Sequence, residues 1–123
     1  MVQIGARPEQ LGMVRVLTLA IGFGLGLGID EAADLELVVN EIAAVLVAVA
    51  VPEAVVRYEY CQEATLLRVY ISARARAEPV PGGLGWHIVR ALATDVVIDY
   101  DHFGSDPGGQ EVRVGFTWGR SPD

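Results

Sequence analysis

The stretch "DEAADLELVVNEIAAVLVAVAVPEAVVRYEY", residues 30–60, changes its hydrophobic period at Pro52. Before this proline, apolar residues recur every three to four positions, which predicts a helix from about 31 to 50 with Asp30 as its N-cap. The second half of that helix is apolar nearly all round, so we expect it to be buried on most sides. From residue 56 onward apolar and charged residues alternate, which predicts a strand.

The same reading of periodicity places the remaining elements. Upstream, it predicts a short edge strand at 2–6 and a helix that begins after Pro8 and ends near Gly22. Downstream, it predicts a strand around 67–71 that pairs antiparallel with the one before it, a third helix in "LGWHIVRALATD" at 84–95, and two strands near 96–101 and 111–118 around the turn "GSDPGG". The third helix should face inward through Leu84, Ile88, Val89 and Leu92.

This order of elements favours an α+β fold, a two-layer α/β sandwich in which helices cover one face of a mostly antiparallel sheet. The 123 residues, 52% of them hydrophobic, are enough for a single domain spanning 1–123 with its own core. The net charge is −7 and all nine basic residues are arginine. We therefore expect no nucleic-acid partner, and the lack of lysine excludes a Walker-type phosphate loop.

Two features of the sequence bear on the cellular compartment of the protein: the single Cys61 and the apolar segment in the N-terminal half. A single cysteine cannot form an internal disulfide and reads as a reduced, structural thiol. Residues 11–29 are long enough to span a membrane, but Arg15 and the glycines at 22, 24, 26 and 28 favour a core helix followed by a loop. With no signal-peptide pattern at the start, the expectation is a cytoplasmic protein without a membrane partner.

Several polar and aromatic residues allow two interpretations. Glu41 is either a surface glutamate on the last polar turn of its helix or a general base at a cleft. His87 reads as a packed or rim histidine and His102 as a solvated one, and no metal site is expected. Trp86 and Trp118 read as core or rim aromatics, or as interface anchors if exposed.

The segments "DEAADLELVVNEIA" at 30–43 and "PGGLGWHIVRALATDVVIDY" at 81–100, with a strand pair between them, resemble the RsbW-type anti-sigma factors. These belong to the GHKL superfamily of Bergerat-fold, histidine-kinase-like (HATPase) ATPases, and the similarity is greatest to its divergent actinobacterial anti-sigma-F-like branch. The likeness covers almost the whole chain and implies the same fold.

The resemblance implies a nucleotide site with degenerate motifs. In the family, a helix carries Glu-x-x-x-Asn, in which the glutamate activates the attacking group and the asparagine binds magnesium. Glu41 matches the glutamate, and Val45 stands in place of the asparagine. A valine offers no oxygen to a hard cation. The family's adenine-binding Asp-x-Gly-x-Gly corresponds here to Ala73, Ala75 and Ala77.

A second glycine motif of the family is retained. Gly82, Gly83 and Gly85 precede the third helix, where backbone N–H groups and the helix N-terminus could receive phosphates. Together with Asn40 they form the residual ATP site that the resemblance implies. The alternative is that these are plain helix-start glycines. We expect ATP and magnesium to bind weakly or not at all, and any vacant adenine space to be closed near Ala73 and the loop 75–82.

The function implied by the resemblance is that of an anti-sigma factor. It would sequester an alternative sigma factor of the stress or sporulation type and switch to an antagonist of the STAS type; a homodimer stays open. The alternative is an active serine/threonine protein kinase that phosphorylates the antagonist with Mg-ATP, with Glu41 as base. Because the family's magnesium-binding asparagine and adenine-binding Asp-x-Gly-x-Gly are replaced here, we favour an anti-sigma factor without kinase activity.

Overall fold

The order of elements is the one that the hydrophobic periods predict. The structure, a computed structural model, describes residues 1–101 and 108–119. Its elements are β1 Val2–Ala6, the 3-10 turn Pro8–Gln10, α1 Leu11–Gly24, α2 Ile29–Val49, β2 Val56–Glu63, β3 Leu66–Ala75, α3 Gly83–Leu92, β4 Thr94–Tyr100 and β5 Gln110–Gly119. His102 and most of the predicted turn at 104–109 lie outside the described residues.

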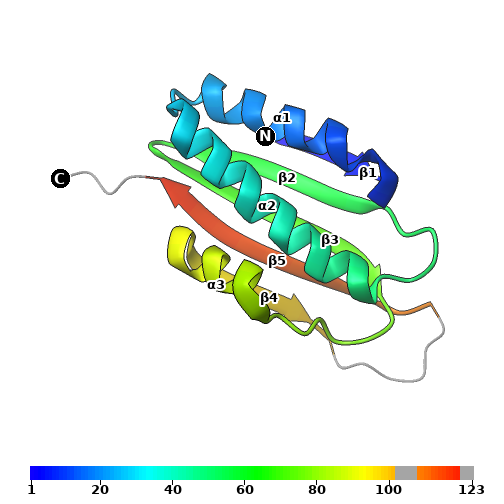
Figure 1. The fold of residues 1–123 in the computed structure, drawn as a ribbon. Coiled ribbons are helices and arrows are strands. Elements are labelled where there is room, and N and C mark those ends of the chain that lie inside the picture. The colour runs from blue at the N-terminus through cyan, green and yellow to red at the C-terminus, as the bar shows by residue number, and fades with distance from the viewer. Residues whose placement is uncertain (102–107, 120–123) are drawn as a thin grey trace.

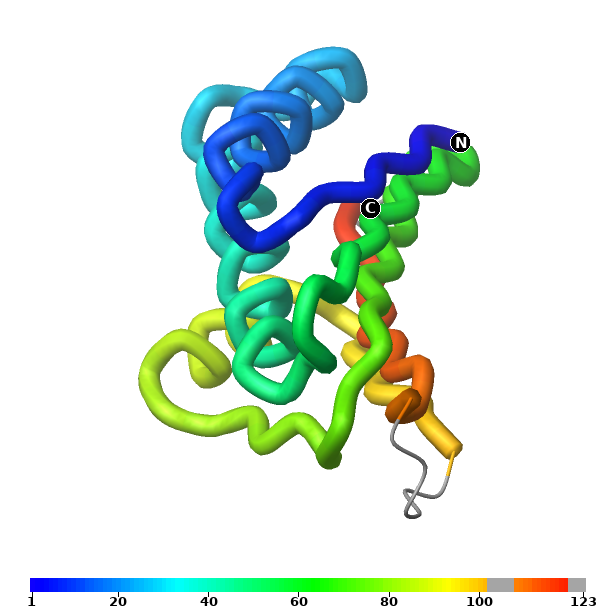
Figure 2. The backbone as a smooth tube through the Cα atoms, turned by 90° about the vertical axis from the view of Figure 1, so that its right-hand side faces the viewer, coloured from blue at the N-terminus to red at the C-terminus, as the bar shows by residue number. Residues whose placement is uncertain are grey.

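The strands form one sheet in the order β1-β2-β3-β5-β4, and every neighbouring pair is antiparallel. The three α-helices lie on one face of this sheet, which leaves its other face uncovered by helices (Figures 1 and 2). The predicted α+β two-layer sandwich is therefore confirmed. Strands β1 and β4 form the two edges, and β1 is the edge strand predicted at 2–6.

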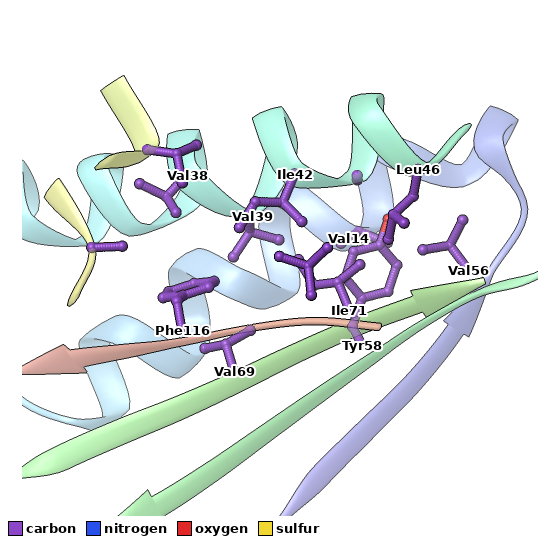
Figure 3. Close-up of a cluster of buried hydrophobic side chains, with 14 of the residues drawn as sticks. Val14, Val38, Val39, Ile42, Leu46, Val56, Tyr58, Val69, Ile71 and Phe116 are labelled. Carbon is purple, nitrogen blue, oxygen red and sulfur yellow. The ribbon is translucent and has the colours of Figure 1, made fainter. Parts of the chain in front are cut away.

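The core lies between the sheet and α2. In β2, Val56, Tyr58 and Tyr60 are buried and alternate with more exposed residues, as their pattern predicts. Figure 3 shows side chains of α2, among them Ile42 and Leu46, pointing at the sheet. A buried polar contact joins α1 to β2: Thr18 Oγ1 lies 2.6 Å from the Tyr60 hydroxyl and donates to the Val14 carbonyl at 2.8 Å.

Two expectations for α2 are wrong. The N-cap is Gly28, and Asp30 lies inside the first turn, where its charge still favours the helix dipole. The second half is not buried on most sides, because Ala44, Val47 and Ala48 are exposed and only Ile42, Ala43 and Leu46 are buried. The cause is geometric: α2 has the sheet beneath it and one helix on each flank, so its outer face has no neighbour among the described elements (Figure 1).

The inward face of α3 also differs from the expectation. Trp86 and Val89 are buried, whereas Leu84 is 76% and Leu92 is 39% exposed. Leu84 lies two residues, about 200° around a helix, from Trp86, so the two side chains cannot face the same neighbour. The ten-residue helix α3 therefore packs on α2 through a narrow stripe of its surface that contains Trp86 and Val89.

Candidate functional site

Glu41 of α2 and Gly85 of α3 are in direct contact. Gly85 belongs to the first turn of α3, and a Cβ atom added to it would overlap the Glu41 carboxylate and lie 2.7 Å from its carboxyl carbon. Glu41 is only partly exposed. The structure thus brings together two predicted site residues that are 44 positions apart in the sequence, and glycine at 85 is what makes room for the carboxylate.

The other glycines shape the start of α3. Gly82 is the N-cap in an extended conformation, and Gly83 has φ +73°, in the left-handed region that favours glycine. A Cβ atom on either of them would meet nothing within 4 Å. Among the described residues no side chain caps this helix end, so its first N–H groups can donate hydrogen bonds to an anion. Such an anion would approach the Glu41 carboxylate, and the two like charges would repel unless a cation bridged them.

The two residues near Glu41 that the family motifs single out, Val45 and Asn40, differ in what they offer such a cation, because only Asn40 has a side-chain oxygen. Val45, one turn further along α2, is a partly buried residue that packs against the core. The Asn40 side chain leaves α2 about 100° around the helix axis from that of Glu41. Its buried Oδ1 has no hydrogen-bond partner among the described residues. Within residues 1–101 and 108–119, no group of three or more His, Cys, Asp and Glu side chains is arranged to hold a metal ion.

The alanines at the positions of the adenine-binding motif are part of the core. Ala73 is 2% and Ala75 is 0% exposed, while Ala77 is exposed in the loop that follows β3. A methyl group at 73 has no acceptor for an adenine amino group. The two buried positions therefore pack as ordinary strand residues that face the helices.

Backbone hydrogen bonds join the end of α2 to the end of β3 beside these alanines. The Val51 N–H donates to the Arg74 carbonyl and the Arg76 N–H to the Val49 carbonyl, both at 2.9 Å, around an Ala50–Ala75 bridge. This backbone pairing brings the helix end and the strand end together. Pockets at four places on the described surface are lined by other residues and not by Glu41, Ala73 or the glycines of α3.

The remaining singled-out residues take structural places. Trp86 and Trp118, 8% and 9% exposed, are core-rim aromatics as predicted. His87 is exposed on α3, so it is not packed. Cys61 is a free, partly buried thiol. No helix within the described ranges combines the length and hydropathy that crossing a bilayer requires.

Sequence reasoning missed Arg74 and Gly109. The Arg74 guanidinium donates to the carbonyls of Gly108 and Gly109 at 2.8 and 2.7 Å. Gly109 has φ +76°, and a Cβ there would lie 2.9 Å from a Val51 methyl and overlap the Ala75 carbonyl. The paired glycines at 108–109 were a usable signal, because a glycine at the start of a strand often marks close approach of another backbone segment.

Comparison with known proteins identifies the family. No protein-family model matches the chain. Over 116 residues it is 34% identical to the protein named anti-sigma-F factor RsbW from Mycobacterium tuberculosis, in both strain CDC 1551 / Oshkosh and strain ATCC 25618 / H37Rv. The match covers 93% of this chain and 69% of each relative. With the expected sandwich fold in place, this similarity shows that the chain belongs to the RsbW family of anti-sigma factors.

Proposed function

We propose that this protein is an anti-sigma factor that binds an alternative sigma factor and keeps it from directing transcription. The observation that carries the proposal is the 34% identity over 93% of the chain to proteins named anti-sigma-F factor. Because sigma factors act on the chromosome, the protein would work in the cytoplasm.

The mechanism that we propose is masking by contact between proteins. The chain has net charge −7, and segments that bind DNA carry lysine and arginine to neutralise phosphates. An acidic partner could cover such a segment and compete with DNA for it. Electrostatic attraction of this kind also speeds association and makes it sensitive to salt.

We further propose that an antagonist of the STAS type releases the sigma factor by taking its place, and that nucleotide has a weak part or none in this exchange. Two observations support the weak nucleotide site: Val45 offers magnesium no ligand, and Ala73 and Ala75 are buried in the core. Each of these opposes binding of a magnesium-bound triphosphate.

The alternative, a protein kinase that phosphorylates the antagonist, is favoured by one observation. Glu41 is positioned at the start of α3, where a general base beside a phosphate cradle would lie. Calorimetry with Mg-ATP at a protein concentration near 100 μM separates the two functions. Saturable, magnesium-dependent binding, with antagonist phosphorylation that Glu41→Gln abolishes, would establish the kinase.

The anti-sigma function is tested with the alternative sigma factors of the source genome, each purified singly. We expect one of them to bind at micromolar affinity or tighter, and run-off transcription by its holoenzyme to fall as this protein is added. The housekeeping sigma factor is the matched control and should neither bind nor lose activity. Failure of every alternative sigma factor to bind would contradict the proposal.

A further inference from the structure

A preformed pocket lies at the end of the molecule where α1 meets α2. It has a volume of about 400 Å³ and is framed by three segments: the α1–α2 loop, the β2–β3 turn and the end of β5. These three segments lie side by side at one end of the molecule (Figure 1). Glu31 lines the pocket. It precedes Glu41 by ten residues, about 15 Å along α2, so this pocket is separate from the residual nucleotide site.

The lining is mainly hydrophobic. Leu67 and Trp118, neighbours across the β3–β5 pair, are 3% and 9% exposed. Leu25, Leu27 and Leu66 add partly buried apolar surface. A pocket of this kind suits one large apolar side chain, and such buried anchors supply most of the affinity at protein interfaces.

Two turns hold the walls in place. At the end of α1, Leu27 N–H donates to the Gly22 carbonyl and Gly26 N–H to the Phe23 carbonyl, both at 3.0 Å. With Gly26 at φ +83°, this is the Schellman arrangement that terminates helices firmly. On the opposite wall, Ala64 in the β2–β3 turn has φ +54°. Because both loops are ordered turns, the pocket exists without a partner, and binding needs little ordering of it.

The surroundings of the pocket are acidic. Glu31 lies in its lining, and among the described residues no arginine does. Asp30 and Asp34 stand on the first two turns of α2 and take part in none of the four ion pairs found between described residues. An apolar cavity beside carboxylates fits a segment in which a large apolar residue is flanked by lysine or arginine.

We propose that this pocket receives an apolar side chain from a basic, DNA-contacting segment of the sigma factor, whose flanking cations pair with Asp30 and Asp34. This inference rests on the proposed anti-sigma function, because that function supplies a partner with the required combination of charge and hydrophobic residues. It adds the place of contact and explains how binding would exclude DNA: the same cations cannot serve both surfaces.

The test uses the sigma factor that binds in the experiment above and three single variants of the full chain. Thr65→Trp places an indole at the mouth of the pocket, and Asp30→Arg reverses a charge beside it. Asp101→Arg makes the same charge change in an exposed residue just after β4, whose end is at the far end of the sheet. Circular dichroism and the urea midpoint of each variant confirm that the fold is kept.

We expect Thr65→Trp and Asp30→Arg to weaken sigma-factor binding at least tenfold, and Asp101→Arg to change it less than threefold. Raising the salt concentration should weaken the wild type more than Asp30→Arg. Wild-type affinity in both pocket variants would overturn this inference and leave the anti-sigma function standing. If the wild-type protein binds no sigma factor, both proposals fail.

Discussion

Replacing Gly85 with alanine tests the contact between α2 and α3. In a helix, Gly→Ala ordinarily stabilises by about 0.8–1.0 kcal/mol, since alanine restricts the unfolded chain more. Here the new methyl group would overlap the Glu41 carboxylate and lie 2.7 Å from its carboxyl carbon. The carboxylate is the end of a flexible side chain and can turn away. Moving the side chain off its preferred rotamer costs about 0.5–1.5 kcal/mol. The two effects should nearly cancel in the wild-type background.

Combining the substitutions isolates the contact. In a Glu41→Ala background nothing opposes the new methyl group, so Gly85→Ala should stabilise by the full amount of about 1 kcal/mol. The expected coupling between the two positions is therefore about 1 kcal/mol, within the range for side chains in contact. Urea unfolding of the wild type, both single variants and the double variant measures it.

Glu41→Gln is the matched control, because glutamine keeps the bulk and removes the charge. If the contact is steric, Gly85→Ala should show the same small effect in the Gln background as in the wild type. Additivity of Gly85→Ala and Glu41→Ala within about 0.3 kcal/mol would show that the two residues do not touch. It would refute the contact between the Glu41 carboxylate and the first turn of α3.

Three further predictions concern stability and follow from burial and backbone geometry. Burial raises the pKa of Tyr58 and of Tyr60 to about 12, so stability present below pH 10 should be lost between about pH 10 and 12 as the unfolded state ionises first; Tyr60→Phe should flatten urea midpoints measured from pH 8 to 11. Gly109→Ala should lower the free energy of unfolding by more than about 1 kcal/mol, because φ is +76°, and an unchanged urea midpoint would contradict the strain. Ala73→Asp, at a site 2% exposed, should lower the free energy of unfolding by at least about 2 kcal/mol without creating Mg-ATP binding; a stable variant that binds ATP in calorimetry would contradict the proposal that the nucleotide site is weak or lost.

The sequence predicts the fold well because its two hydrophobic periods are clear and separated by Pro52. Alternation identifies β2 and β3 with the correct buried faces. What it cannot predict is how many neighbours an apolar helix has. The second half of α2 reads as buried all round, yet Ala44 and Val47 face solvent, since helix periodicity reports composition around the axis and not the layers that surround it.

The site is predicted in part. Family motifs single out Glu41 and the glycines of α3, and the structure places Glu41 against Gly85. The motifs say nothing of the pairing between the end of α2 and the end of β3, because backbone hydrogen bonds carry no side-chain signature. The pocket beside Trp118 cannot be predicted from the sequence either, since it forms from three segments that are distant along the chain: the α1–α2 loop, the β2–β3 turn and the end of β5.

The most direct measurement is the affinity for the sigma factor with and without 1 mM Mg-ATP, by calorimetry or fluorescence anisotropy. If the protein acts by contact alone and its nucleotide site is closed, the two dissociation constants should agree within twofold. An affinity that increases tenfold or more with Mg-ATP, and returns to its nucleotide-free value when EDTA is added, would contradict this view. It would show that nucleotide still controls binding of the sigma factor.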